Sequence, residues 1–312
     1  MIEYMKDDKS PWASLGLLLV LTVICSVAAQ FVVILLGLLT SGSLHAAQQD
    51  GVAVAAFTEK PFFMYALLVA SSFGTFLLPA IILQLREPFR SYFPTENKGN
   101  LGFYVLAVLL LVAFGPVMQW VGALNSEMSL PPGLAGIEAW MRAQEDKMAV
   151  LTEQIVMVDH VGLLLSNILV MAVVPAIAEE YYFRGSLMQI IQRLTHNHHI
   201  TVWLTAVIFS AIHVQFFGFF PRLILGVFFG YMFVWSRNIW VPILGHFVNN
   251  ATVTVIAFVY TKQGKTFDDL QHNETYSIFV YLGSLIITGA LAFYFYKKSK
   301  QQQQIIHGER LD

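Results

Sequence analysis

The chain has 312 residues, of which 56% are hydrophobic and 12% are charged, and its mean hydropathy is +0.63. In soluble domains roughly a quarter of the residues are charged, so this composition excludes an ordinary soluble protein and indicates a surface that faces lipid. The net charge of -2 and the pI near 6.5 give no electrostatic basis for binding nucleic acid.

Apolar segments of membrane-spanning length recur along the chain. A hydrocarbon core about 30 Å thick requires about 20 residues of helix. The first segment, residues 14–39, carries no charge and is too long for a signal peptide; its Cys25 is the one cysteine, so no intrachain disulfide forms. Further segments lie at 61–85, 101–124, 161–180, 200–216, 221–236, 239–260 and 276–296. The predicted fold class is all-α, a polytopic membrane helical bundle of about eight transmembrane helices.

The basic residues predict how these spans are oriented. With eight spans, twelve Lys and Arg residues lie on the side of the two termini and six on the opposite side. The positive-inside rule then places both termini in the cytoplasm. We expect a multi-pass integral protein of a bacterial plasma membrane, with a single membrane domain over residues 1–300 and a solvated C-terminal tail, 301–312, beyond the last helix.

The loop of residues 125–160 is not predicted to span the membrane. Its segment 136–158 repeats apolar residues at helical spacing between charged ones. This pattern predicts an amphipathic helix that lies at the membrane interface and packs over the bundle. A lid or a substrate-gating element is the alternative interpretation.

Few ionisable residues fall inside the predicted spans. Glu179 and Glu180 lie at the end of one span, His213 and His246 lie within two others, and every aspartate lies outside them. A charged side chain near the centre of a membrane helix costs about 2.5–3.5 kcal/mol, so such residues are usually paired and functional. These four residues therefore form a candidate site.

Helical spacing distinguishes the two glutamates. Glu180 and Arg184 are four residues apart and share one helix face, whereas Glu179 lies about 100° around the helix. We therefore expect Arg184 to neutralise Glu180 in a supporting ion pair, which leaves Glu179 as the candidate general base. Burial in a medium of low dielectric constant increases the basicity of a carboxylate, as general-base catalysis requires.

The two histidines carry polar or aromatic residues one turn away. His246 and Asn250 share a helix face, and Phe209 precedes His213 by four residues, where it is expected to pack beneath the imidazole. A straight helix that begins at residue 200 would put His213 about 20 Å along its axis, so convergence with Glu179 requires that helix to tilt.

Together these groups fit the hydrolysis of a peptide bond. Glu179 and His213 would share an activated water, and His246 and Asn250 would donate hydrogen bonds to the tetrahedral oxyanion. The same residues permit a metalloprotease alternative, because Glu179, His213 and His246 make a known type of zinc set. The sequence lacks an HExxH motif, an aspartate within a span, and a serine in a GxSG context, which argues against other intramembrane proteases.

Three motifs occur in order on three apolar segments: Glu179-Glu180-xxx-Arg184, Phe209-xxx-His213 and His246-xxx-Asn250. In this the chain resembles the CPBP (Abi) family of CAAX-protease and bacteriocin-processing proteins, which includes the type II CAAX prenyl endopeptidases. The resemblance covers residues 160–255. It implies a helical bundle with Glu179 and His213 activating water and with His246 and Asn250 as oxyanion donors, and it leaves a glutamic and a metal-dependent mechanism open.

The expected function is an intramembrane endopeptidase that acts on membrane-associated proteins or peptides, prenylated CAAX-type proteins among them. Its expected partners are that substrate and the lipid bilayer, and not nucleic acid; the sequence does not indicate an oligomeric state. No cofactor is expected on the glutamate–water mechanism, and a divalent metal such as zinc on the alternative. The competing hypothesis is a non-catalytic scaffold, regulatory or bacteriocin-immunity protein; a transporter fits less well, because the in-membrane charges concentrate within residues 179–246.

Two further patterns have simpler interpretations. His196, His198 and His199 lie in a short loop with no acid or cysteine nearby in sequence and are expected to be solvated. Gly226 and Gly230 form a GxxxG pattern, which is typical of close helix packing.

Overall fold

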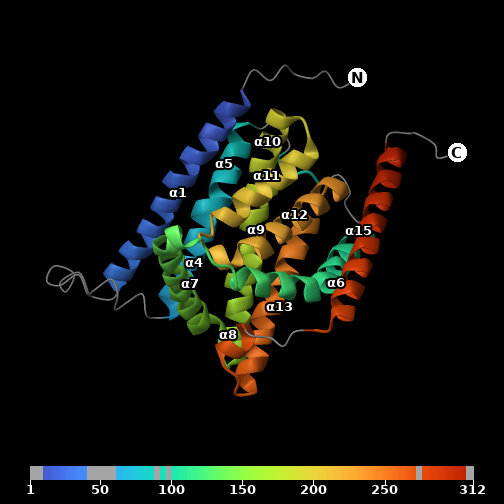
Figure 1. The fold of residues 1–312 in the computed structure, drawn as a ribbon. Helices are drawn as coiled ribbons and strands as arrows, with labels where there is room; N and C mark the ends of the chain where they lie inside the picture. The colour runs from blue at the N-terminus through green and yellow to red at the C-terminus, as the bar shows by residue number, and fades with distance from the viewer. Residues whose placement is uncertain (1–9, 41–60, 88–91, 96–99, 272–275, 307–312) are drawn as a thin grey trace. The chain divides into compact units, whose positions relative to one another are not determined.

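The computed structural model describes residues 10–40, 61–87, 92–95, 100–271 and 276–306 (Figure 1). Over these residues the chain is helical, and its β-structure is an isolated bridge between Thr95 and Asn238. The chain divides into two compact units, one made of residues 1–93 with 177–201 and the other of residues 94–176 with 202–312.

Within the described residues, seven helical segments are long and apolar enough to cross a membrane. They are Pro11–Thr40, Phe62–Arg86, Leu101–Ser126, Val161–Thr195, Phe216–Ser236, Trp240–Lys262 and Ile278–Gln302. The predicted polytopic helical bundle is thereby confirmed. The predicted span 200–216 is a shorter helix, α11 (His198–Ala211), whose 14 residues extend about 21 Å and fall short of the hydrocarbon thickness.

Helix α11 ends earlier than predicted because its last turn changes to three-residue hydrogen bonds and is followed by a residue in the left-handed conformation. The His213 amide donates to the Ser210 carbonyl and the Val214 amide to the Ala211 carbonyl, both with three-residue spacing. Val214 then takes a left-handed conformation, with φ of 52°, which a helix cannot continue through. His213 therefore lies in the turn after the helix and not within a span.

In the first unit, α1 (Pro11–Thr40) packs against α4 (Pro61–Ser72), the π-helical segment η1 (Phe73–Leu77) and α5 (Leu78–Arg86). The closest approach is at Gly74, where a Cβ atom would lie 2.6 Å from the Ala29 Cβ and 2.7 Å from the Cys25 carbonyl oxygen. Only glycine permits this backbone contact. A hydrogen bond of 3.0 Å from Thr75 to Ser26 joins the same two segments.

The same unit contains a buried polar cluster that the sequence did not predict. Glu87, 1% exposed, accepts hydrogen bonds from Ser14 at 2.8 Å and from the Tyr92 hydroxyl at 2.5 Å. Burial and the neighbouring Glu87 carboxylate raise the pKa of Tyr92 to about 12, so this hydroxyl keeps its proton and remains a donor. The cluster thus joins the start of α1 to the chain that follows α5.

In the second unit, α6 (Leu101–Ser126), α12 (Phe219–Ser236), α13 (Trp240–Lys262) and α15 (Ile278–Ile306) pack together, and α15 runs alongside α6 (Figure 1). Ser284 and Ser299 of α15 donate hydrogen bonds of 2.5 Å to the carbonyl oxygens of Ala113 and Trp235. The buried core is formed by Phe103, Leu106, Ala107, Leu110, Phe229, Met232, Val241 and Phe295.

Helix α15 extends further than predicted. It continues through the Lys- and Gln-rich stretch to Ile306, so residues 301–306 of the predicted tail are helical, and 307–312 lie outside the described residues. The stretch contains no glycine or proline before residue 308, and Lys and Gln have high helix propensity. Its polarity marks the end of the apolar span but not the end of the helix.

The GxxxG pattern acts in packing, as predicted. A Cβ atom at Gly226 would lie 3.0 Å from the Ala206 Cβ, and one at Gly230 would lie 2.9 Å from a Val202 methyl. Helices α11 and α12 therefore approach each other closely over these two glycines.

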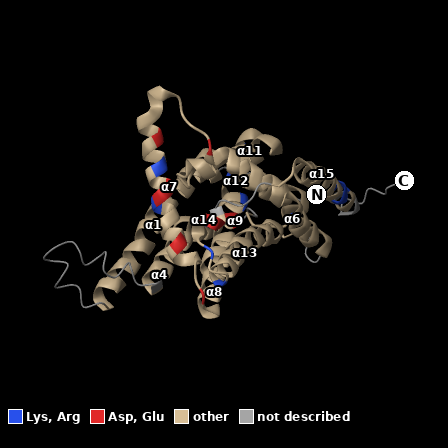
Figure 2. Ribbon diagram, turned by 60° about the horizontal axis from the view of Figure 1, so that its bottom comes forward, with Lys and Arg blue, Asp and Glu red and all other residues tan. Residues whose placement is uncertain are grey.

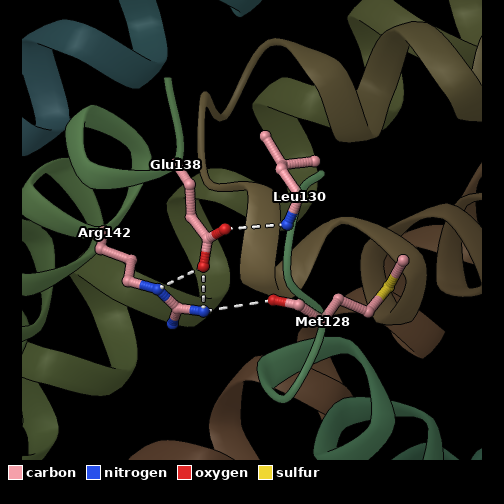
Figure 3. Close-up of polar contacts among 4 residues, drawn as sticks. All are labelled: Met128, Leu130, Glu138 and Arg142. Atoms are coloured by element: carbon pink, nitrogen blue, oxygen red, sulfur yellow. Dashed lines mark hydrogen bonds and ion pairs between the residues drawn. The ribbon is translucent and has the colours of Figure 1, made fainter. Parts of the chain in front are cut away.

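The predicted amphipathic helix is present as α7 (Ala135–Val156). Charged residues follow one another along it, in contrast to the spans of its unit (Figure 2). At its start, Glu138 accepts a hydrogen bond of 2.8 Å from the Leu130 amide and pairs with Arg142 at 2.7 Å (Figure 3). Arg142 also donates to the Met128 carbonyl at 3.2 Å. These contacts fix α7 to the loop that leads into it.

Candidate active site

The two glutamates of the first motif lie inside a long helix and not at its end. The helical segment Val161–Thr195 includes α9 (Val174–Glu180), the π-helical η4 (Tyr181–Leu187) and α10 (Met188–Thr195). The prediction that the span ends at residue 180 was wrong, because the polar residues that follow are buried and the helix continues through them. Single-turn π segments of this kind often occur at functional sites.

Glu180 and Arg184 form the ion pair that the helical spacing predicts. The Arg184 Nη1 lies 2.8 Å from the Glu180 Oε1, and both side chains are 0% exposed. Two opposite charges at this depth are tolerated because they compensate each other. Glu179, the next residue along, is also buried, at 8% exposed, and its charge acts on Arg184 as well.

Aromatic contacts hold this segment in the first unit. The Tyr182 and Phe183 rings pack on Phe76, at centroid distances of 5.4 and 5.7 Å. The Tyr182 hydroxyl also forms a hydrogen bond of 2.9 Å with the Thr22 hydroxyl. The backbone that carries Glu179 is therefore held by side chains on both α1 and η1.

His213 lies in the second unit, in the turn after α11. Its Nδ1 lies 2.8 Å from the Phe209 carbonyl oxygen, and its ring packs on the Phe209 ring at 5.3 Å, as the four-residue spacing predicts. Burial, assisted by the positive charge of Arg222, lowers the pKa of His213 to about 4. The imidazole is therefore neutral near pH 7, and an Nδ1–H donated to the carbonyl leaves Nε2 as an acceptor.

The turn that carries His213 is held by Asn125, a buried residue at the end of α6. Its amide nitrogen donates to the Phe216 carbonyl at 3.1 Å, and its oxygen accepts from the Phe220 amide at 2.9 Å. Asn125 therefore bridges both sides of the short 3-10 helix η5 (Phe216–Gly218). Sequence reasoning missed this residue, because its two partners lie more than 90 positions away.

His246 is buried in α13, at 4% exposed. Its ring stacks on Phe229 with a centroid distance of 5.0 Å and an interplanar angle of 15°, and it meets the Phe209 ring edge-on at 6.1 Å. Phe209 thus contacts both imidazoles. The second unit brings the two histidines of the second and third motifs to one aromatic side chain.

Asn250 lies one turn beyond His246 on α13, as predicted. Its amide nitrogen donates a hydrogen bond of 3.1 Å to the Met171 carbonyl oxygen in the π-helical segment η3 (Ile168–Val173), and its oxygen accepts one of 3.1 Å from Asn249. A primary amide carries two N–H donors, so the contact with Met171 uses one and fixes the direction of the other. Neither partner was predicted.

The predicted site residues are divided between the two units. Glu179, Glu180 and Arg184 belong to the first, and His213, His246 and Asn250 to the second. Within either unit, the described residues include no group of three or more His, Cys, Asp and Glu side chains arranged to hold a metal ion. The catalytic roles and the zinc alternative both stay predictions.

Comparison with known proteins gives one family match. Residues 161–252 match the family described as "Type II CAAX prenyl endopeptidase Rce1-like". The chain is also similar to "Uncharacterized protein YpbD" of Bacillus subtilis (strain 168), with 26% identity over 113 residues, 35% of this chain. The match spans 55% of that relative's length. No solved structure matches the chain.

The matched segment begins at the first residue of α8 (Val161–Asn167) and ends two residues after Asn250. It includes all three motifs. Over residues 161–252 the chain is thus similar to the Rce1-like family of type II CAAX prenyl endopeptidases, which confirms the resemblance that those motifs indicate.

Proposed function

We propose that the protein is an intramembrane endopeptidase that cleaves membrane-associated peptides or proteins. The observation that carries this proposal is the buried Glu180–Arg184 ion pair beside Glu179, inside the segment that matches the endopeptidase family. A purely structural ion pair needs one carboxylate. A second buried carboxylate in an apolar span costs stability, and such groups are retained mainly where they act in function.

In the proposed reaction Glu179 is the general base. It takes a proton from water, and the water oxygen bonds to the carbonyl carbon of the scissile peptide as the C=O bond opens to an oxyanion. His246 and Asn250 donate hydrogen bonds to this oxyanion, and the neutral His213 orients the water through Nε2. The C–N bond then breaks, and the proton held by Glu179 passes to the leaving amine.

The substrate and the topology are parts of the same proposal. The substrates would be peptides or membrane proteins that reach the site from the bilayer, prenylated CAAX-type proteins among them. Both termini would lie in the cytoplasm. In the metal-dependent alternative, Glu179, His213 and His246 would hold a zinc ion that polarises the carbonyl or the water.

The test is cleavage of membrane-anchored and soluble peptides by the purified protein in detergent, followed by mass spectrometry. Glu179→Gln is expected to reduce the rate by at least about 100-fold, as loss of a general base does. The matched control Glu127→Gln alters an exposed carboxylate at the end of α6 and should leave the rate unchanged. Activity that survives Glu179→Gln would remove Glu179 as the base.

A chelator separates the two mechanisms. Activity that persists in chelator supports the glutamate–water mechanism, whereas activity that is lost and then restored by added zinc supports the metal alternative. Peptides that bind tightly to the wild-type protein but are never cleaved would support the non-catalytic hypothesis.

A further inference from the structure

An apolar pocket lies beside His213 in the second unit. It has a volume of about 330 Å³ and is enclosed on one side by Trp140 and Met141 of α7. The opposite side comes from the chain around His213, where Ala211 and Val214 line it. Ligand sites in proteins have volumes of about 300–1,000 Å³, so this pocket can enclose one bulky group but not a long ligand.

Two polar groups in the wall of the pocket are bonded to other parts of the protein. The Ser210 hydroxyl donates to the Phe219 carbonyl at 2.6 Å, and the Gln215 side-chain oxygen accepts from Arg222 at 3.1 Å. Apart from Ser210 and Gln215 the lining residues are apolar, and a polar group seated against them would lose hydrogen bonds to water, at a cost of about 1–3 kcal/mol for each one not replaced. The pocket selects an apolar group.

Helix α7 is held firmly enough over this turn to form a defined wall. The Arg142 guanidinium lies 4.2 Å from the centre of the Phe217 ring, and the Glu145 carboxylate accepts a hydrogen bond from the Phe217 amide. Burial raises the pKa of the Glu145 carboxyl, while the positive charge of Arg222 opposes that shift. Two consecutive turns of α7 thus contact η5, and Trp140 and Met141 lie directly before them.

The entrance of the pocket is open and apolar. Trp140 is 51% exposed and Val214 58% exposed, so a group approaching from outside the unit can reach the cavity past them. Val214 is held in a left-handed backbone conformation that costs a β-branched residue about 1–2 kcal/mol. Strain of this kind is typically retained where a site requires a particular shape.

We propose that this pocket binds one bulky apolar side chain of the peptide substrate and that Trp140 and Met141 determine which side chain is accepted. The inference rests on the proposed endopeptidase function. A side chain seated between Ala211 and Val214 would fix the substrate backbone within a residue or two of His213, which is what a specificity pocket does. A lipid acyl chain would satisfy the same walls, so the test separates the two.

The first arm measures cleavage of a peptide series that carries Ala, Leu or Phe at one position at a time. Met141→Trp should fill the pocket, and the rate constant kcat/KM for the Leu and Phe peptides should fall by about 10–200-fold with the Ala peptide little changed. Met148→Trp is the matched control, because it makes the same replacement on an exposed position of α7. Identical profiles for these two variants would overturn the inference.

The second arm measures binding and does not depend on turnover. Fluorescently labelled Ala, Leu and Phe peptides are titrated into protein that carries Glu179→Ala, with and without Met141→Trp. Weaker binding of Leu and Phe peptides alone supports the pocket even if the wild-type protein cleaves nothing, which would refute only the proposed function. Binding that ignores side-chain size in every variant shows that the pocket holds lipid only, and overturns the inference.

A third variant covers the case in which Met141→Trp does not fold. Trp140→Ala removes one wall and should shift the preference toward larger side chains, so that Phe gains relative to Ala. A preference that stays at the wild-type ratio in correctly folded Trp140→Ala protein would also contradict the assignment.

Discussion

Glu179 and Glu180 are adjacent in sequence, and both are buried, yet the ion pair involves the second residue. We expect Glu180→Gln to lower the free energy of unfolding by about 3 kcal/mol, because the fully buried Arg184 loses its bonded partner. Glu179→Gln should change it by less than about 1 kcal/mol. Thermal unfolding of both variants in detergent checks this, and an equal loss in the two would show that Arg184 depends on both carboxylates.

His213 provides a pH-dependent prediction. Its pKa is about 4 in the folded protein and 6.5 ordinarily, so between these values the unfolded chain binds more protons. Stability should therefore fall as the pH decreases from 6.5 to 4, by up to about 3 kcal/mol at about 1.4 kcal/mol per pH unit. The positive charge of Arg222 opposes protonation of His213 in the same direction as burial.

The measurement is the unfolding midpoint across this pH range. His213→Gln should flatten the dependence, whereas His199→Gln, at an exposed position, should retain the wild-type slope. A slope that His213→Gln leaves unchanged would contradict the assigned cause.

At the residue scale, contacts one helical turn apart were predictable and contacts between distant segments were not. The Glu180–Arg184 pair and the Phe209–His213 packing follow from four-residue spacing alone. The bond from Asn250 to Met171 and the bridge made by Asn125 join residues about 80 or more positions apart. Their partners are backbone groups, two carbonyl oxygens and one amide N–H, which the sequence does not distinguish from any others.

Among the helices, the contact of α1 with η1 depends most on a single residue. Gly74→Ala should destabilise the protein by about 1–3 kcal/mol, because the new methyl group would meet the Ala29 Cβ at 2.6 Å and the Cys25 carbonyl. Gly16→Ala on α1 is the control, since nothing lies within 4 Å of its Cβ position.

The Gly16→Ala control should be neutral or stabilise by up to about 1 kcal/mol through helix propensity. Unfolding in a detergent series measures both variants. If Gly74→Ala proved as stable as Gly16→Ala, the close approach of the two helices would not hold in solution.

The spans were predicted well at the element scale, and their ends less well. Hydropathy located each apolar segment, but it does not distinguish a helix that ends from a helix that continues with polar residues. For this reason the predicted ends were too early for two helices: the one carrying Glu179, which extends to Thr195, and α15, which extends to Ile306. The end of α11 depends on the left-handed Val214, an unusual conformation for valine that no propensity would indicate.

For the whole molecule, the arrangement of charges predicts the sidedness of the chain. Seven crossings would leave the two termini on opposite sides of the membrane. They lie on the same side only if the short α11 completes an eighth crossing before α12. We expect cysteines at Ser10 and Lys300, introduced into a Cys25→Ser background, to be labelled from the cytoplasm. A cysteine at Lys262 should be labelled from the opposite side, and opposite labelling of Ser10 and Lys300 would mean that α11 does not complete a crossing.

The first unit is formed by two segments that are distant in sequence, which has a consequence for biosynthesis. Its opening residues, 1–93, are completed by residues 177–201, so more than eighty residues of the other unit are translated in between. During that interval Thr22 and Phe76 lack their contacts with Tyr182, which has not yet been translated. Helices α1, α4 and α5 therefore enter the membrane before the unit is complete. Glu179, the proposed base, lies in the segment that completes this group, whereas its proposed partners His213 and His246 are translated later. Completion of the first unit therefore precedes catalytic competence.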